Sequence, residues 1–227
     1  MKEKLDALSK NHTWDLVTLP PRKSMVSCKW ICKIKTSFNG SIERYKARLV
    51  AKGFTQEYRI DYEETFAPIA RISSVRALLA VAAASKCDRF QIDVKNVFLN
   101  GDLSEEVYMQ PPPSLSVESN KVCRLQCGLY GLKQASRAWF AKFSSTIFRL
   151  GYSASPYDSA LFLRRTNKST ILLFLYVDDT IITGDDFSGI QELKDFLNQQ
   201  FEMKDLGHLN YFLGLEITHS TDGLYIT

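Results

Sequence analysis

The chain has few of the residues that carry histidine-based catalysis, membrane insertion or secretion. Only three histidines are present, His12, His208 and His219, and they lie far apart in the sequence, so we assign them no chemistry. No apolar run approaches the roughly 18 residues of a membrane span. The first residues, Met1–Lys4, carry no apolar core of a secretion signal. These absences disfavour a membrane protein and a secreted one.

Cysteine is also scarce, with five residues in 227. An odd number fits free thiols in a reducing compartment better than a disulfide framework. Cys28 and Cys32 are four positions apart, as are Cys123 and Cys127, and this spacing is not the usual one for zinc. No histidine lies near either pair. Structural zinc is therefore disfavoured, and an intracellular location is expected.

The charge of the chain is concentrated near its N-terminal end. The net charge is only +4, but residues 22–59 contain ten basic side chains against two acidic ones, a local balance of +8. Aromatic residues are interleaved with the basic ones. Alone, such a segment indicates an ordinary solvated face, but beside a site that needs a phosphate substrate it favours phosphate binding. With 45% hydrophobic residues, the chain is long enough for one large or two small folded domains.

The most informative motif is the adjacent pair Asp178–Asp179. It lies between the apolar run Ile171–Leu175 and the segment Thr180–Thr183. Successive side chains of a strand point to opposite faces, so neighbouring aspartates converge only where the backbone turns. The pair therefore predicts the tip of a hairpin. Because hairpin tips prefer Asn-Gly or Asp-Gly, this pair indicates a role other than turn stability.

A third carboxylate, Asp93, is predicted at the end of a strand, because alternating residues lead from it into the break at Asn96–Gly101. Three clustered carboxylates would repel one another by about 4 kcal/mol per close pair at an effective dielectric constant of about 20. Such a cluster calls for a cation, and oxygen ligands suit Mg²⁺ or Mn²⁺. Two such ions perform phosphoryl transfer without a catalytic histidine, cysteine or serine. For Asp93 alone, a solvated turn residue is the simpler interpretation.

Periodicity and turn signals predict alternating strands and helices. Asn39–Gly40 is a strong hairpin signal, and Ser73–Ser74 are expected to cap a helix. The predicted strands cover residues 26–36, 42–52, 160–166, 170–177 and 180–183, and the predicted helices cover residues 73–86, 134–151 and 188–201. Order and spacing favour an antiparallel sheet backed by helices.

Longer blocks carry a resemblance to a known family. The blocks are Tyr45–Gln56, Asp61–Pro68, Asp93–Gly101, Leu129–Ala135, Tyr176–Asp179 and Tyr211–Ile217. In this order they resemble the reverse transcriptase domain of copia-type retrotransposon Pol polyproteins. The resemblance implies an α+β fold, with a palm formed by a ferredoxin-like antiparallel sheet backed by helices, and with β-rich fingers. The fingers would cover approximately residues 22–70 and 105–135, and the palm approximately residues 71–104 and 136–227. The thumb and RNase H regions are expected to be missing.

The resemblance also implies roles for individual residues in RNA-directed DNA polymerisation. Asp93, Asp178 and Asp179 would be catalytic and would bind two Mg²⁺ or Mn²⁺ ions, together with the backbone carbonyl of Val94. The implied partners are an RNA or DNA template, a primer and dNTPs, with integrase and RNase H regions elsewhere in the parent polyprotein and no membrane. The implied location is the cytoplasm, within virus-like particles.

The remaining implied roles concern the nucleotide and the primer. Arg48 and Lys46 would bind the triphosphate of the dNTP, and Phe98 would exclude a ribose 2′-OH by steric clash. Gln134 would lie beneath the incoming nucleotide, whereas Lys133 is expected to be solvated. Further roles fall on a candidate general acid, Lys204, and on a primer grip, Phe212, Leu213 and Gly214, where a close backbone approach would explain the glycine.

Three positions depart from the family pattern, and two other functions stay open. Arg59 stands where the family usually has glycine, Ser136 where it has proline, and Val97 where it has alanine. The branched side chain of Val97 is expected to crowd the dNTP pocket. The main alternative function is an inactive retroelement fragment that retains only nucleic-acid binding. A nucleotide cyclase on a similar palm is disfavoured, because it would lack the basic segment and the block around Gln134.

Overall fold

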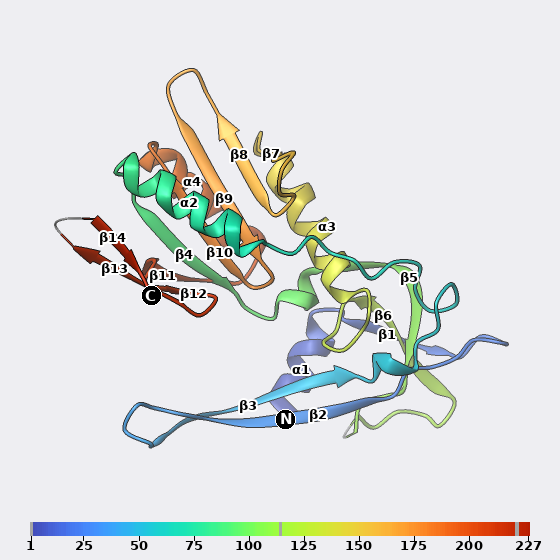
Figure 1. The fold of residues 1–227 in the computed structure, drawn as a ribbon. Helices are drawn as coiled ribbons and strands as arrows, with labels where there is room; N and C mark the ends of the chain where they lie inside the picture. Colours follow the sequence, from blue (N-terminus) through green and yellow to red (C-terminus); the bar gives the residue numbers. More distant parts are fainter. Residues whose placement is uncertain (1, 114, 221–222) are drawn as a thin grey trace. The chain divides into compact units, whose positions relative to one another are not determined.

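The computed structural model of the chain describes residues 2–113, 115–220 and 223–227. It divides into two compact units, each with its own core (Figure 1). Unit 1 comprises Met1–Ala67 and Phe98–Phe143, and unit 2 comprises Pro68–Val97 and Ser144–Thr227. The predicted α+β class with antiparallel sheets is confirmed. Within the described residues, no helix is both long and apolar enough to span a bilayer.

Unit 1 contains a three-stranded antiparallel sheet in the order β1-β6-β5 and a separate two-stranded ribbon, β2-β3. Its elements are α1 (Lys2–Lys10), β1 (Trp14–Thr18), β2 (Cys28–Thr36), β3 (Ile42–Ala51), η1 (Gly53–Thr55), η2 (Val97–Asn100), β5 (Asp102–Met109), β6 (Lys121–Cys127) and the first part of α3 (Ala135–Phe148). The core of the unit lies where α1, the sheet and the start of α3 meet, around Met109, Cys123 and Leu129.

The ribbon β2-β3 confirms the predicted hairpin. Asn39–Gly40 form its turn, where Gly40 adopts a φ of +81° that glycine reaches without strain. Side chains of a strand alternate between two faces, so the register separates the ribbon into two surfaces. One face carries six basic residues, Lys29, Lys33, Lys35, Arg44, Lys46 and Arg48. Ile31 and Val50 lie on the same face, opposite Arg48 and Lys29, and the other face includes Trp30, Ile34 and Tyr45.

Unit 2 is built on a six-stranded antiparallel sheet in the order β11-β4-β10-β9-β8-β7. Its elements are α2 (Ile72–Ala84), β4 (Arg89–Val94), β7 (Ser153–Ala154), β8 (Leu161–Arg165), β9 (Thr170–Tyr176), β10 (Asp179–Gly184), α4 (Phe187–Gln200), β11 (Met203–His208), β12 (Tyr211–Phe212), β13 (Leu215–Ser220), β14 (Gly223–Ile226) and the last part of α3. β4 and β10 are far apart in the sequence but pair side by side in the sheet (Figure 1). Strands β12, β13 and β14 form a second, small sheet.

The predicted helices of unit 2 are confirmed, with one correction at a helix start. The apolar positions of α2 are buried as the 3.6-residue period predicts, and Leu79 packs in one cluster with Phe174 of β9 and Ile181 of β10. The predicted cap at Ser73–Ser74 is wrong, because α2 begins at Ile72 and the N-cap residue, Arg71, makes no side-chain cap bond. Both serines therefore lie inside the first turn.

The backbone conformation of Arg59 explains why the family usually has glycine at this position. Its φ is +64°, in the left-handed region where a Cβ atom causes strain and glycine does not. The conformation closes a turn in which the Arg59 N–H donates to the carbonyl of Tyr62 at 2.8 Å. The guanidinium also lies 5.3 Å from the centroid of the Tyr58 ring. Arginine at this position is therefore strained in its backbone while its side chain is held by an aromatic neighbour.

Replacing Arg59 should separate these two effects. Arg59→Gly and Arg59→Ala both lose the contact with Tyr58, but only glycine relieves the strain of the positive φ. We expect Arg59→Gly to be more stable than Arg59→Ala by about 1 kcal/mol in urea unfolding of the full chain. Equal stability of the two variants would mean that the turn does not need a left-handed residue at position 59.

Candidate active site

The backbone of unit 2 brings the three predicted aspartates together. β9 ends at Tyr176 and β10 begins at Asp179, so the predicted hairpin is present, but its two-residue loop is Val177–Asp178, one residue earlier than the predicted tip Asp178–Asp179. Asp179 is the direct partner of Asp93 in the pairing of β10 with β4. The N–H of Val94 donates to the carbonyl of Asp178 at 2.8 Å. The predicted proximity of Asp93 to the Asp178–Asp179 loop is therefore confirmed.

The loop that carries Asp178 is strained. Val177 has a φ of +53°, and a β-branched residue in this region is an outlier. Residues with this φ in a two-residue hairpin loop are usually glycine, asparagine or aspartate. A strained conformation persists only where the surrounding structure holds it, and such positions cluster at functional sites. The observed φ thus agrees with the interpretation that this turn is kept for a reason other than stability.

The three carboxylates interact electrostatically. Asp179 is half-buried, and its pKa is raised above the usual value chiefly by burial. A hydrogen bond from Gln91 Nε2 to Asp179 Oδ1, at 3.1 Å, acts in the opposite direction, whereas the charges of Asp178 and Asp93 raise the pKa further. Each aspartate therefore disfavours the ionised form of Asp179, and a bound cation would offset this repulsion. Gln91, which the motif analysis did not single out, holds one of the three carboxylates in place.

The donor chemistry of this cluster fits Mg²⁺ or Mn²⁺, since carboxylate and carbonyl oxygens are the ligands that these ions prefer. The positions of the side chains do not form a finished coordination shell: among the described residues, no three His, Cys, Asp or Glu side chains are arranged to hold an ion. The structure therefore brings the backbones of Asp93, Asp178 and Asp179 together, and the metal-binding roles of these residues and of Val94 stay predictions.

Lys204 lies across from the carboxylates in the same sheet. It is the partner of Asp93 in the pairing of β11 with β4, so both side chains project from the same face of the sheet. β11 is tied to α4 by an ion pair of 3.0 Å between Lys194 and Asp205. Lys204 itself is exposed. Its position beside Asp93 agrees with the predicted role of general acid, which stays a prediction.

The predicted primer grip lies at the turn between β12 and β13. Phe212 is buried and its ring lies 6.3 Å from that of Tyr176, next to the aspartate loop. Leu213 and Gly214 have φ values of +51° and +87° and form the two-residue hairpin loop. No described atom of the chain lies within 4 Å of a Cβ built on Gly214, so packing within the protein does not require the glycine, and the close approach to a primer stays a prediction. The glycine serves the turn conformation.

In unit 1, two of the predicted nucleotide-binding residues, Arg48 and Phe98, contact one ring, that of Tyr130. The guanidinium of Arg48 lies 4.9 Å above the centroid of the ring, and Phe98 packs its ring edge-on against it at 4.8 Å. Lys46 projects from the same face of β3 as Arg48, directly opposite Lys33. Tyr130 belongs to one of the family blocks, but no pattern in the sequence indicated that it links Arg48 with Phe98.

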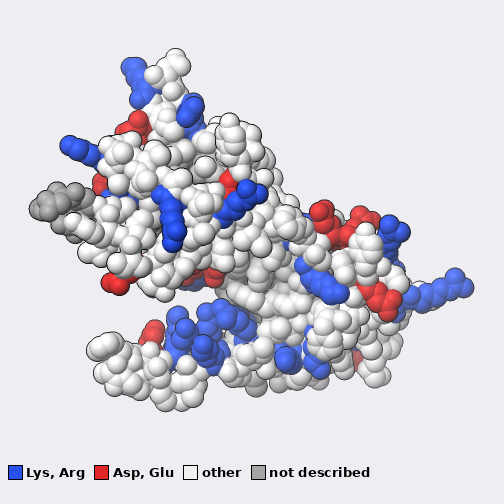
Figure 2. Space-filling view, viewed as in Figure 1, with Lys and Arg blue, Asp and Glu red and all other residues white. Residues whose placement is uncertain are grey.

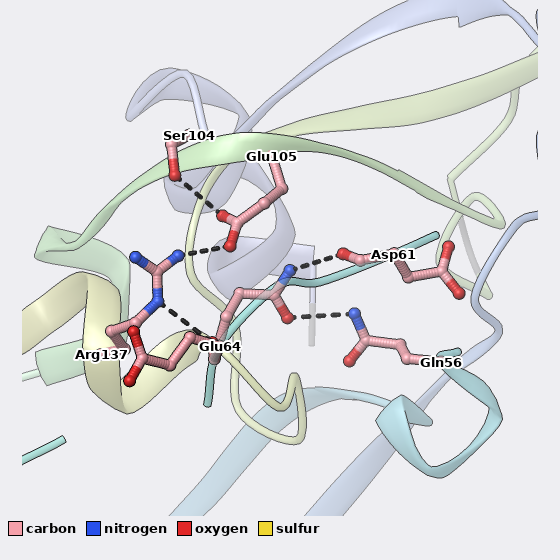
Figure 3. Close-up of polar contacts among 7 residues, drawn as sticks. Gln56, Asp61, Glu64, Ser104, Glu105 and Arg137 are labelled. Carbon is pink, nitrogen blue, oxygen red and sulfur yellow. Dashed lines mark hydrogen bonds and ion pairs between the residues drawn. The ribbon is translucent and has the colours of Figure 1, made fainter. Parts of the chain in front are cut away.

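Gln134 has a fully buried side chain that bonds within unit 1. Its Oε1 accepts a hydrogen bond from Gln56 Nε2, and its Nε2 donates to the carbonyl of Asp61, both at 3.0 Å (Figure 3). The expectation that Lys133 is solvated is wrong. Its ammonium donates to the carbonyl of Gln56 at 3.0 Å and to the hydroxyl of Tyr62 at 3.2 Å.

The other two departures from the family pattern are accommodated by the fold. Ser136 lies in the first turn of α3, where serine and proline are both tolerated because the N–H groups there have no partner within the helix. Val97 is 1% exposed, so its branched side chain fills the interior. The expected crowding of an open nucleotide pocket by Val97 is not supported.

Comparison with known proteins gives the family. A family model described as reverse transcriptase (RNA-dependent DNA polymerase) matches residues 11–227. The retrovirus-related Pol polyprotein from transposon RE1 of Arabidopsis thaliana is 42% identical over 100% of this chain and 16% of its own length. The corresponding polyprotein from transposon TNT 1-94 of Nicotiana tabacum is 43% identical over 96% of this chain and 17% of its own length.

A solved structure titled as the foamy viral protease-reverse transcriptase in complex with double-stranded DNA is 14% identical, with a TM-score of 0.47, and covers 100% of this chain and 34% of that chain. This chain spans less than a fifth of the length of the curated polyproteins that it matches. The family model matches residues 11–227, and the RE1 polyprotein is more than 40% identical over the whole chain. The chain therefore belongs to the reverse transcriptase family and is similar to the reverse transcriptase region of copia-type retrotransposon Pol polyproteins.

Proposed function

We propose that this domain catalyses RNA-directed DNA synthesis by two-metal nucleotidyl transfer, adding dNTPs to the 3′-OH of a primer. The observation that carries the proposal is the register of unit 2, which pairs Asp179 with Asp93 and bonds the carbonyl of Asp178 to the end of β4. Three carboxylates that repel one another at the end of adjacent strands require a cation. In this proposal unit 2 is the palm and unit 1 forms the fingers.

Different residues have different roles in the proposed reaction. Two divalent ions, when bound, would activate the primer hydroxyl and stabilise the charge that develops on the phosphate oxygens. Asp93, Asp178 and Asp179 would hold these ions through their carboxylate oxygens, and Gln91 fixes the carboxylate of Asp179. Lys204, on the face of the sheet that bears Asp93, donates a proton to the departing pyrophosphate. The phosphoryl group is transferred directly, so no covalent enzyme intermediate is needed.

The nucleotide and the primer are bound by other residues. Arg48 and Lys46 bind the triphosphate, and Phe98 excludes the ribose 2′-OH. Gln134 is 0% exposed, so it supports the nucleotide through the groups that it holds in place. Phe212, Leu213 and Gly214 hold the primer end. The other proposed partners, an RNA or DNA template and the integrase and RNase H regions of the parent polyprotein, follow from the family.

The basic face of β2-β3 supports nucleic-acid binding. Figure 2 shows Lys and Arg side chains gathered along this hairpin. Lys33 lies directly opposite Lys46, and Lys35 directly opposite Arg44. Like charges in directly opposed positions destabilise a ribbon, so this arrangement indicates a bound polyanion. The phosphates of a nucleic-acid backbone would neutralise these charges without any contact to the bases. Such binding suits a polymerase, because a polymerase must accept any template sequence.

Removing charge from this face should weaken template binding in a salt-dependent way. For Lys33→Gln combined with Lys35→Gln, the slope of log K against log salt for single-stranded RNA should become shallower by about 1.4, at roughly 0.7 per lost phosphate contact. The two lysines repel their partners across the ribbon, so the change should leave thermal stability unchanged or slightly higher. Fluorescence anisotropy over a range of salt concentrations measures the slope.

The matched control removes the same number of charges elsewhere, with Lys10→Gln and Lys168→Gln at two exposed positions outside the hairpin. This control should keep the wild-type slope. An equal loss of slope in both double variants would show that binding follows net charge and not the hairpin surface.

A single-nucleotide incorporation assay tests the proposed function. The full chain is mixed with a primed RNA template, Mg²⁺ or Mn²⁺, and each dNTP in turn. We expect the primer to grow by one residue only with the dNTP complementary to the template. Binding of the primed template without growth under any of these conditions would favour the alternative, an inactive fragment that retains nucleic-acid binding.

A further inference from the structure

A second polar centre lies within unit 1 and joins two segments that are far apart in the sequence. One is the irregular stretch 56–64, and the other is the start of α3 with the loop before it. Its central feature is a chain of three hydrogen bonds. The N–H of Lys133 donates to Gln56 Oε1 at 2.9 Å, Gln56 Nε2 donates to Gln134 Oε1 at 3.0 Å, and Gln134 Nε2 donates to the Asp61 carbonyl at 3.0 Å. We call this chain the glutamine relay.

The relay fixes both amide orientations. A backbone N–H only donates and a backbone carbonyl only accepts, so the Lys133 N–H at one end and the Asp61 carbonyl at the other set the direction of every bond between them. Turning either amide over would place two donors or two acceptors face to face. The orientation of Gln134 is therefore imposed by Gln56, and neither side chain has an alternative orientation that keeps all three bonds.

The relay is buried and therefore costly to break. Gln56 is 4% exposed and Gln134 is 0% exposed. Asp61 is also buried, and its carboxylate accepts from the N–H of Glu57 at 2.9 Å and from the hydroxyl of Ser24 at 3.1 Å. A buried amide that loses its partner keeps the full cost of desolvation. The relay thus holds stretch 56–61 against the start of α3 as one unit.

Close backbone packing continues the relay toward Tyr130. A Cβ on Gly53 would fall on the carbonyl of Gly131, and a Cβ on Gly131 would fall on the carbonyl of Ala51. The N–H of Ala51 donates to the Tyr130 carbonyl at 2.8 Å. Segment 129–134 is therefore held on one side by β3 and on the other by Gln56. These contacts fix the backbone from which the Tyr130 ring projects.

A second set of bonds anchors the next turn of α3. Arg137 Nε donates to the carbonyl of Glu64 at 3.1 Å, and the Arg137 guanidinium also pairs with Glu105 (Figure 3). Ser104 in turn donates to Glu105 at 3.0 Å. The relay ends on the carbonyl of Asp61 and this second set ends on the carbonyl of Glu64, so both reach the stretch 56–64. The far end of the stretch is thus fixed independently of the relay.

We propose that Gln56 and Gln134 are positioning residues for the incoming nucleotide and act through Tyr130. The relay holds segment 129–134, and the Tyr130 ring then orients Arg48 at 4.9 Å and Phe98 at 4.8 Å. This inference rests on the proposed function, in which Arg48 binds the triphosphate and Phe98 tests the sugar. It assigns part of the dNTP affinity and of the sugar discrimination to the buried bond between Gln56 and Gln134.

The test is Gln56→Leu in the full chain, assayed by single-nucleotide incorporation. Leucine fills the site but neither accepts from Lys133 nor donates to Gln134. We expect KM for the dNTP to rise about tenfold while kcat stays within about twofold, because the carboxylates of unit 2 are unchanged. Discrimination against the matching ribonucleotide should fall with the loss of Phe98 orientation. The matched control is Gln126→Leu, an exposed glutamine of unit 1 with one side-chain partner, Asp15, and it should keep the wild-type KM.

Two further measurements keep the inference falsifiable. In a double-mutant cycle with Tyr130→Leu, the effects on KM should be less than additive, because both changes act on the same contacts. Additive effects, or an unchanged KM in Gln56→Leu, would overturn the inference. If Gln56→Leu does not fold, the test uses Tyr130→Leu alone. An unchanged KM for the dNTP in Tyr130→Leu would overturn the inference.

Equilibrium binding of a dNTP to the full chain separates this inference from the proposed function. If the wild-type chain binds the dNTP but does not extend a primer, the polymerase proposal fails for this domain. In that case the inference about the relay is supported if Gln56→Leu weakens dNTP binding about tenfold. It is overturned if Gln56→Leu and the wild-type chain bind the dNTP equally well. Absence of dNTP binding by the wild-type chain would overturn both proposals together.

Discussion

Asp178→Asn should lower the rate of nucleotide incorporation by about a thousandfold or more while folding and template binding survive. Asparagine has nearly the same shape as aspartate, so it can keep the backbone bond from Val94 to residue 178 and the two-residue loop. It lacks the negative charge that a divalent ion requires. Single-turnover primer extension measures the rate, and anisotropy measures template binding.

The matched control for this change is Asp195→Asn, an exposed aspartate on α4 that pairs with Gln191 at 2.9 Å. It removes the same charge from the same unit and should leave the rate unchanged. If Asp178→Asn loses template binding and thermal stability along with incorporation, the carboxylate supports folding. If incorporation is unchanged, the catalytic assignment of Asp178 is refuted.

Gly131→Ala should have the largest effect on stability, a loss on the order of 3 kcal/mol. Two costs combine at this position. Its φ of +91° strains any residue with a Cβ, and the Cβ would collide with the carbonyl of Ala51 and lie 2.9 Å from Val50 Cγ1. Neither obstacle is the end of a flexible side chain, so β3 and segment 129–134 must separate. Urea unfolding of the full chain measures the loss.

Gly40→Ala provides the matched control for this loss. Gly40 has a similar φ of +81°, but no described atom lies within 4 Å of the added Cβ. This change should cost only the backbone strain, about 1 kcal/mol. The excess loss in Gly131→Ala therefore reports the close packing alone. Equal losses of unfolding free energy in the two variants would show that β3 moves to accept the added Cβ at little cost. The close packing of β3 against segment 129–134 would then no longer support the glutamine relay.

Local sequence signals predicted the ribbon β2-β3, the strands β4 and β8–β10 and the helices α2–α4, but not β1, β5–β7 or β11–β14. The Asn39–Gly40 turn and the Asp178–Asp179 hairpin were predicted because their signals lie within a few residues of one another. The start of α2 was missed because Ser73 and Ser74 are good caps by residue type, whereas the helix begins before them, at Ile72. Helix starts depend on the packing of the preceding chain, which local preference does not contain.

The candidate site was predictable only in part. The carboxylates could be named because Asp178 and Asp179 are adjacent and a strand pattern ends near Asp93, and the resemblance then gave Asp93 its role. The glutamine relay could not, because Gln56 and Gln134 are 78 residues apart and buried glutamines have no periodic signal. Both residues lie in family blocks, Tyr45–Gln56 and Leu129–Ala135, that carry no catalytic group of their own. Blocks of that kind are where a search for such buried contacts could begin.

Mn²⁺ binding by the full chain, measured by electron paramagnetic resonance with primed RNA template and dNTP present, tests the central claim most directly. The claim is that Asp93, Asp178 and Asp179 together hold divalent ions. We expect the wild-type chain to bind Mn²⁺, Asp195→Asn to bind it equally well, and both Asp93→Asn and Asp178→Asn to lose most of the binding. Unchanged Mn²⁺ affinity in the latter two variants would contradict the account.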